Sequence, residues 1–184
     1  GEAVQGDPDV TSYTVKPEEH KSPRVTRKLY IPVSKRPKPY DAPHIPLNYR
    51  LLRYADVLLM YAEVENALGN DGEARWALNE VRGRVDLSEV TASGTALRDA
   101  IRLERRLELA LENNRLFDLR RWKEAENVLN GDFYGMNFSG KDNSSFYVRT
   151  PYLKRVYKKA YYWFPIHQSE IDKNDKLVQS PYWN

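Results

Sequence analysis

Cysteine is absent from the chain, histidine is rare, and no long uninterrupted apolar run occurs. Without cysteine the protein can form no disulfide, no thiolate nucleophile and no thiolate metal site. The three histidines, His20, His44 and His167, stand far apart, with no His-x-x-x-His or Glu-x-x-His pair among them. Zinc and di-iron centres need such pairs. The sequence therefore predicts no metal site.

Sequence motifs of catalysis and nucleotide binding are also missing. We find no Gly-x-Gly-x-x-Gly stretch, no Walker-type loop and no Gly-x-Ser-x-Gly elbow. No nucleophile stands at a readable spacing from a base. The net charge of +3 is too small to indicate a polyanionic partner. We expect a protein that is not an enzyme and that uses no cofactor.

The length of 184 residues suits one globular domain, with 41% hydrophobic and 30% charged residues. The most apolar stretch, residues 49–68, contains Arg53, Asp56 and Glu63, so we do not expect it to span a membrane. The chain opens without a signal peptide or a lipidation cysteine. We expect it to be a piece of a longer protein.

The order of residue types predicts an extended arm followed by helices. Residues 1–47 hold eight of the eleven prolines, which excludes long helices there. Residues 49–68 and 73–85 are expected to form a helical hairpin of the tetratricopeptide type. Gly69 suits the left-handed cap of the first helix, and Asp71 can cap the second. The small and apolar residues expected to face inward are Ala74, Ala77, Leu78 and Val81.

Further helices are predicted over residues 95–113, starting from a Thr95 cap, and over residues 115–129. Residues 131–150 are expected to form a loop, residues 161–166 a short buried extended segment, and the tail one helical turn followed by coil. The predicted fold is thus all-α, with tetratricopeptide-like helical hairpins, long loops and little strand. We divide it into a proline-rich extended arm, residues 1–47, and a helical domain, residues 48–184.

Charged residues lie among apolar ones in residues 101–121, so some must be buried and paired. The residues expected to form structural ion pairs are Glu104, Arg105, Glu108, Arg115 and Asp118. Glu104 and Glu108 lie one helical turn apart and could instead serve as a carboxylate pair for acid–base chemistry. We favour the ion-pair interpretation because so many arginines stand beside these carboxylates.

Two further patterns could bind a ligand. Lys16 to Lys38 is rich in basic residues and could contact nucleic acid, but it contains no recognisable module, so we favour a solvated arm. The aromatic residues proposed to bind a ligand are Phe133, Tyr134, Phe138 and Tyr147. Aromatic faces can stack on sugar rings, which makes residues 131–150 a candidate glycan site. The alternative is that these rings pack against the helices or a neighbouring domain.

Several separated motifs resemble the carboxy-terminal half of the SusD/RagB family across about residues 45–184. They are Arg53-Tyr-Ala-Asp-Val-Leu-Leu-Met-Tyr-Ala-Glu63, Leu78-Asn-Glu-Val-Arg-Gly-Arg84, Glu104-Arg-Arg-Leu-Glu108, Asp118-Leu-Arg-Arg-Trp122 and Phe164-Pro-Ile166 with Glu170, Asn174 and Gln179. The chain departs from the family pattern at His167, Asp175 and Ser180, all in the tail.

The resemblance implies a lipoprotein on the extracellular face of the cell outer membrane that works in nutrient uptake. Such proteins bind glycans or other nutrients and sit on a SusC-like TonB-dependent transporter. The resemblance implies no catalytic residue, no nucleic-acid partner, and membrane attachment only through a lipid anchor that this sequence does not contain. The family's amino-terminal half is expected to lie outside the sequence.

Two functions remain open at this point. The first is a non-enzymatic glycan-binding component of a SusC/SusD-like polysaccharide utilization system, with sugar binding that depends little on salt. The second is a tetratricopeptide-like scaffold that binds a protein partner through its helical face and has no sugar site of its own. A nucleic-acid function, ranked third, would show affinity that falls steeply with salt.

Overall fold

The computed structural model describes residues 28, 31, 48, 50–137 and 148–183. The chain divides into two compact units. Residues 47–118 form one, here called the helical unit, and residues 1–46 with 119–184 form the other, the hairpin unit. Most of the described elements are helices, and the described residues contain a single sheet of two strands. The predicted all-α fold with helical hairpins and little strand is confirmed.

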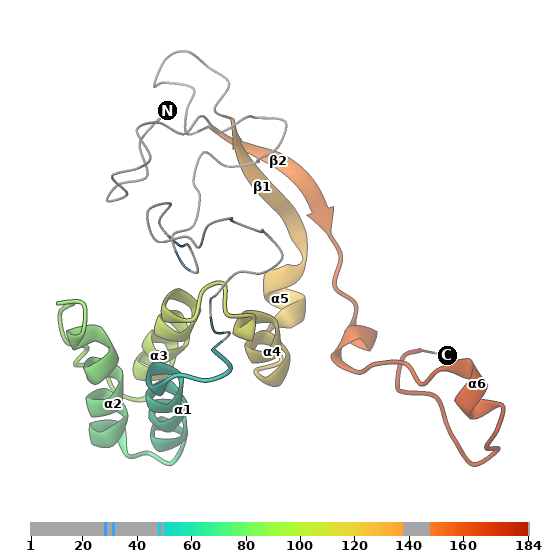
Figure 1. The fold of residues 1–184 in the computed structure, drawn as a ribbon, viewed down its shortest axis with the longest axis horizontal. Coiled ribbons are helices and arrows are strands. Elements are labelled where there is room, and N and C mark those ends of the chain that lie inside the picture. Colours follow the sequence, from blue (N-terminus) through green and yellow to red (C-terminus); the bar gives the residue numbers. More distant parts are fainter. Residues whose placement is uncertain (1–27, 29–30, 32–47, 49, 138–147, 184) are drawn as a thin grey trace. The chain divides into compact units, whose positions relative to one another are not determined.

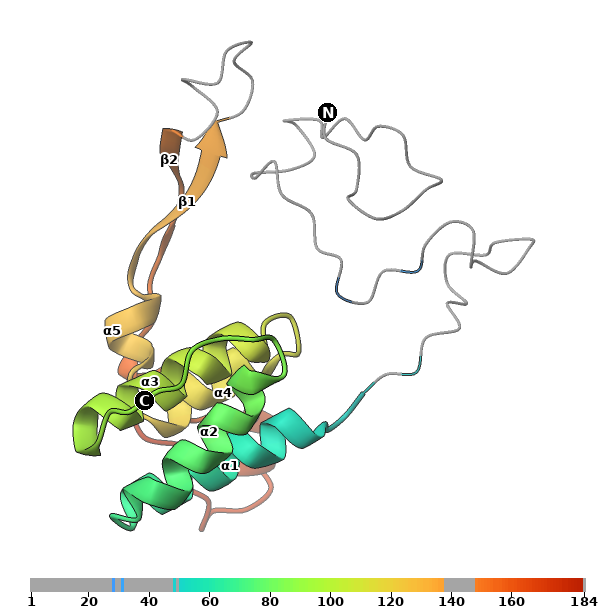
Figure 2. The same ribbon diagram turned by 90° about the vertical axis from the view of Figure 1, so that its left-hand side faces the viewer.

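The helical unit begins with the predicted hairpin. Helix α1 covers Tyr54–Ala67 and helix α2 covers Asp71–Gly83. Gly69 has a φ of 85°, and the Asn70 amide donates to the Glu65 carbonyl at 2.8 Å. That pattern closes α1 with a left-handed residue for which glycine is favoured, as the sequence predicted. Figure 2 shows the two helices side by side.

Small residues let these helices approach closely. Ala62 of α1 and Ala74 and Ala77 of α2 are completely buried. Helix α3, Gly94–Glu108, packs on both and adds Leu97 and Ile101 to the same core. The four residues of α2 that were predicted to face inward are all buried. The outer side of α1 is exposed, including Tyr54, Val64 and Met60, so the helical unit covers α1 on one side only.

Asp71 does not cap α2 in the predicted way. It is the first residue of α2, and its carboxylate accepts hydrogen bonds from the Gly94 amide at 2.7 Å and from Asn66 Nδ2 at 2.8 Å. The first amides of a helix have no partner within the helix, and the Gly94 amide at the start of α3 is one of them. The Asp71 carboxylate supplies the missing acceptor and so fixes the start of α3. The Gly94 amide, followed by the Asn66 side chain, holds the pKa of Asp71 below its usual value.

The lowered pKa predicts a pH dependence of stability. A carboxyl group with a depressed folded-state pKa stabilises the fold above its unfolded pKa of roughly 3.9, and this stability is lost as pH falls through the folded pKa. We expect Asp71→Asn to lower the urea midpoint of unfolding at neutral pH. In acid, the midpoints of the variant and the wild type should become equal. Asp99→Asn, an exposed α3 residue, is the control. An equal difference in urea midpoint between variant and wild type at both pH values would contradict the prediction.

Helix α3 ends five residues before the predicted end at 113, and Arg53 accounts for this. Arg53 Nη2 donates to the Glu108 carbonyl at 2.8 Å. That carbonyl would otherwise accept from the next turn of the helix. Beyond it, Leu111 and Asn113 adopt left-handed backbone angles, with φ of 67° and 65°. A side chain from the start of α1 therefore terminates α3.

The predicted helix over 115–129 is two helices, α4 at Asn114–Arg121 and α5 at Ala125–Leu129. The break falls at Lys123, whose φ is 60°. The Glu124 amide donates to the Leu119 carbonyl at 2.9 Å, which completes the same closing pattern as at Gly69. Lys123 Nζ lies 4.7 Å from the centre of the Tyr162 ring and 4.9 Å from that of Trp163. Cation–π attraction offsets part of the backbone strain.

The predicted loop over 131–150 is wrong at both of its ends, where the chain forms strands. Strand β1, Gly131–Asn137, pairs antiparallel with β2, Val148–Arg155 (Figure 1). Phe133 lies opposite Leu153, and Tyr134 lies opposite Pro151, so Tyr152 is an extra residue that forms a β-bulge. Asn130 closes the base of the hairpin: Oδ1 accepts from the Tyr157 amide at 2.6 Å and Nδ2 donates to the Tyr157 carbonyl at 3.1 Å.

The carboxy-terminal segment is held by side-chain hydrogen bonds and ring contacts. It contains the 3₁₀ helix η2, Lys159–Tyr162, and the short helix α6, Gln168–Ile171. The predicted single helical turn in the tail is confirmed, but the predicted buried extended segment is not, since Phe164 is 77% exposed. The Trp183 indole donates to the Ala160 and Trp163 carbonyls, which folds the end of the chain back onto η2.

Candidate functional site

Arg105 lies at the centre of a buried ion-pair cluster in the helical unit. Its Nη1 donates to Asp56 of α1 at 2.9 Å, while Nε and Nη2 donate to the two carboxylate oxygens of Asp118 at 3.1 and 3.2 Å. The Arg105 and Asp118 side chains are only 5% and 6% exposed. One guanidinium thus neutralises two buried carboxylates and connects α1, α3 and α4.

The carboxylates Glu104 and Glu108 of α3 have separate arginine partners. Glu104 accepts from Arg82 at 2.7 Å. Glu108 accepts from Arg53 at 2.6 Å and from Arg84 at 2.9 Å. Each carboxylate is therefore tied to its own arginines, and the geometry does not bring the two together as an acid–base pair around a common reacting group.

Arg53 and Arg115 differ in their surroundings. Burial acts to lower the pKa of Arg53, but hydrogen bonds to Glu112 and Glu108 and the charges of these carboxylates raise it overall. Burial, with the neighbouring charge of Arg106, lowers the pKa of Arg115, and the charge of Asp118 opposes this effect. Arg115 is half-buried near the start of α4.

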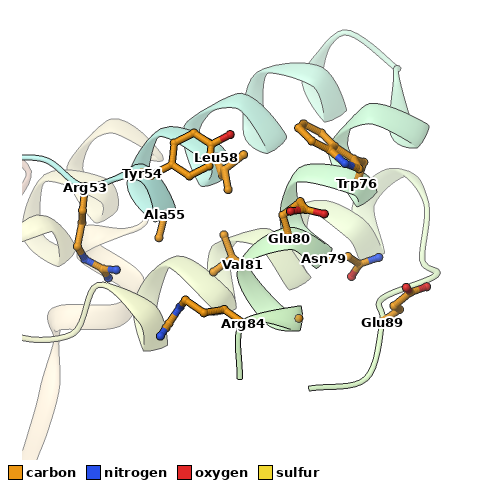
Figure 3. A pocket seen from close by; sticks show the side chains of 11 residues that line it. Arg53, Tyr54, Ala55, Leu58, Trp76, Asn79, Glu80, Val81, Arg84 and Glu89 are labelled. Carbon is orange, nitrogen blue, oxygen red and sulfur yellow. The ribbon is translucent and has the colours of Figure 1, made fainter. Parts of the chain in front are cut away.

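An open cleft of about 890 Å³ lies beside the α1/α2 hairpin. Figure 3 shows Tyr54 and Leu58 reaching it from α1 and Trp76 and Glu80 from α2, with Arg84 directly after the end of α2. Trp76 is 50% exposed, and its ring packs edge-on against Tyr61 with 6.3 Å between ring centres. Sequence reasoning did not single out this cleft, because its lining comes from two helices and from the loop after α2, which contributes Glu89.

The hairpin unit carries two of the four aromatic residues predicted to bind a ligand. Phe133 and Tyr134 are neighbours on β1 and are 44% and 38% exposed, whereas Phe138 and Tyr147 lie outside the described residues. Neighbouring strand residues point to opposite faces. The structure thus places Phe133 and Tyr134 on different faces of the hairpin rather than on one stacking platform.

Arginines from β2 lie over both rings. The Arg149 guanidinium carbon is 3.6 Å from the centre of the Tyr134 ring, and the Arg155 carbon is 5.0 Å from that of Phe133. The Phe133 and Tyr152 rings lie 6.4 Å apart, and Tyr152 is 54% exposed. Each face of the hairpin therefore combines an exposed aromatic ring with a cation. The sequence pattern alone did not indicate these ring–cation partners.

Within the described segments, no helix is long and apolar enough to cross a membrane. Nor do residues 50–137 and 148–183 gather three or more histidines and carboxylates into a cluster that could hold a metal ion. The arrangements with binding chemistry in this part of the chain are the cleft and the aromatic–cationic hairpin.

Comparisons with known proteins agree on one family. The family model described as "SusD family" matches residues 4–183. A SusD-like protein P38 from Formosa agariphila is 41% identical over 93 residues, which cover 45% of this chain and 18% of that protein. A SusD-like protein from Bacteroides ovatus is 39% identical over 80 residues, covering 42% of this chain and 14% of that protein.

A solved structure of a SusD-like protein from Bacteroides fragilis is also similar to this chain. It matches with a TM-score of 0.68 at 33% identity, over 74% of this chain and 26% of the other. The matched stretches span less than a fifth of the curated relatives and about a quarter of this solved structure. Because the family model covers nearly the whole sequence, the chain belongs to the SusD family.

Proposed function

We propose that the chain is part of a non-enzymatic glycan-binding protein on the extracellular face of the outer membrane, which passes oligosaccharides to a SusC-like TonB-dependent transporter. Membership of the SusD family supports this, and the observation that carries a glycan site within this chain is the exposed aromatic hairpin. Phe133, Tyr134 and Tyr152 present rings beside polar and cationic groups. Such combinations are typical of ligand sites.

We further propose that the charged residues of α3 serve the fold rather than a reaction. Glu104, Glu108 and Arg105 each contact oppositely charged side chains from other elements. A general acid or base needs a free position at which it can exchange a proton with a substrate. These contacts support an ion-pair function in holding the helices together.

The proposed function predicts that glycan binding depends on the hairpin. The 184-residue chain should bind oligosaccharides on a glycan array, and titration of a hit should show about tenfold weaker binding for Tyr134→Ala, which corresponds to about 1.4 kcal/mol. Trp76→Ala, which changes an exposed aromatic residue of the cleft, is the matched control and should bind like wild type. Circular dichroism checks that both variants are folded.

Failure to bind any oligosaccharide in a folded sample would contradict a glycan site in this chain. The second candidate function would then gain support, since the cleft presents Trp76 and Tyr54, 50% and 70% exposed, beside Glu80 and Glu89. Aromatic residues at such exposure are typical of protein-binding surfaces. In that case the chain would act as a tetratricopeptide-like scaffold that binds a protein partner through α1 and α2.

A further inference from the structure

The charges on the hairpin point to a particular class of glycan. Strands β1 and β2 contain the cations Arg149, Lys154 and Arg155 and a single carboxylate, Asp132. Among the described residues, none of these three cations forms a salt bridge. The helical unit differs, because its arginines 53, 82, 84 and 105 are all bound to carboxylates. The positive charge of the hairpin is thus left for a partner.

Tyr134 orients one of these cations. At 3.6 Å from the ring centre, the Arg149 guanidinium lies in stacking contact with Tyr134. Stacking covers one flat face of the guanidinium and leaves the N–H groups along its edge to donate in the plane. That edge matches the two oxygens of a carboxylate or a sulfate, to which arginine binds bidentately. Holding the side chain in advance also reduces the entropy lost on binding.

The same face of the hairpin carries a second cation. Tyr134 pairs with Pro151, and Asp132 pairs with Lys154, so residues 132, 134, 149, 151 and 154 share one face by strand alternation. Arg149 and Lys154 lie at its two ends, and both are exposed. Two cations spaced along a strand suit a polymer that repeats its negative charge. Asp132 is the opposing charge on this face, and its carboxylate lies 3.5 Å from the Tyr134 hydroxyl.

We propose that the face formed by Asp132, Tyr134, Arg149 and Lys154 binds an acidic glycan, one that carries carboxylate or sulfate groups. The proposal rests on the proposed glycan-binding function and gives it a ligand class. It also changes the expected role of Tyr134, whose ring holds Arg149 in position instead of stacking on a neutral sugar. The expectation of sugar binding that depends little on salt is replaced by one in which salt weakens binding.

Titrations with matched pairs of oligosaccharides test this. The probes are an oligogalacturonide with its neutral methyl ester, and a sulfated galactan oligosaccharide with its desulfated form. The full chain should bind at least one acidic member about tenfold more tightly than its neutral partner, and added sodium chloride should remove most of the difference. The two pairs separate carboxylate recognition from sulfate recognition.

Substitutions that remove a positive charge and one that removes a negative charge should have opposite effects on binding, which locates the site. Arg149→Gln and Lys154→Gln should each weaken binding of the acidic probe several-fold and leave the neutral probe unaffected. Asp132→Asn should strengthen it, which mere damage to the hairpin would not do. Arg98→Gln removes an exposed cation from α3 in the helical unit and is the control for net charge; it should change nothing.

The outcomes separate the two proposals. If neutral and acidic probes bind equally and lose affinity with Tyr134→Ala, the glycan function stands and the acidic class is wrong. If no oligosaccharide binds, both proposals fall. If single-stranded oligothymidylate binds as tightly as the acidic glycans, the face recognises polyanions in general and the assignment to glycans is overturned.

Discussion

Replacing Arg105 with methionine is expected to destabilise the helical unit by about 3–5 kcal/mol, the range seen when one partner of a buried ion pair is removed. The substitution retains a long apolar side chain but leaves Asp56 and Asp118 buried without their cation. A domain is typically stable by only about 5–15 kcal/mol, so the loss is a large fraction of the total. Urea unfolding followed by circular dichroism measures it through the shift of the midpoint.

The control for this substitution lies on the same helix. Arg98 pairs with Asp99 at 3.1 Å, but both side chains are largely exposed. Exposed pairs contribute about 0–1 kcal/mol, so Arg98→Met should hardly move the midpoint. A loss of less than about 1 kcal/mol for Arg105→Met would contradict the assignment of Arg105 as the structural centre of the cluster.

Removing the two carboxylates as well should restore much of the stability. In the triple variant Arg105→Met, Asp56→Asn and Asp118→Asn no unpaired charge stays buried, and replacement of complete buried ion groups is often close to neutral. A recovery of stability in the triple variant would show that Arg105→Met is costly because it leaves buried carboxylates without a cation. A triple variant as unstable as the single one would show instead that the hydrogen bonds of Arg105 hold α1, α3 and α4 together.

The second large effect is expected from Leu97→Ala. Leu97 is completely buried in the core cluster between the three long helices. Truncating a buried leucine removes its burial energy and leaves a cavity, at a cost of about 2–5 kcal/mol. Leu103→Ala on the same helix removes the same atoms from a side chain that is 53% exposed; a surface change of this kind stays near 0.5 kcal/mol.

The same urea titration measures both leucine variants. Since the helix and the substitution are the same, the difference between them isolates burial from helix propensity. Equal losses at positions 97 and 103 would mean that α3 does not bury the face that contains Leu97 and Ile101.

Local patterns in the sequence were enough for the helical hairpin. Gly69 indicates the turn because a helix commonly ends at a residue with left-handed backbone angles, which glycine adopts readily. The alanines of α2 indicate a close helix contact because their spacing places them on one face of the helix. Both features are decided within a few residues. The family motifs extended the prediction to the rest of the chain, which is why the fold class could be predicted.

Features set by distant residues could not be predicted. Lys123 ends α4 in a conformation that favours glycine, and the rings that contact it lie about forty residues later in the chain, at Tyr162 and Trp163. The pattern of residues 131–150 favours a loop because the stretch is rich in Gly, Asn and Ser, which are typical of turns and loops, and no local signal indicates the pairing of its two ends. The sequence placed Arg105 and Asp118 among the expected ion-pair residues, but nothing local indicates Asp56, which lies 49 residues before Arg105.

Three side-chain amides share one bonding pattern. Asn130 bonds both backbone polar groups of Tyr157, as described above; Asn79 does the same with Val90 and Gln179 with Ile166. Each amide supplies one donor and one acceptor, as a neighbouring strand would. Connecting segments are thereby fixed at single residues rather than along their length. Since loop closure costs only about 0.6 kcal/mol for each doubling of length, the stretches between these anchors can change in length during evolution while the helices and the hairpin keep their places within each unit.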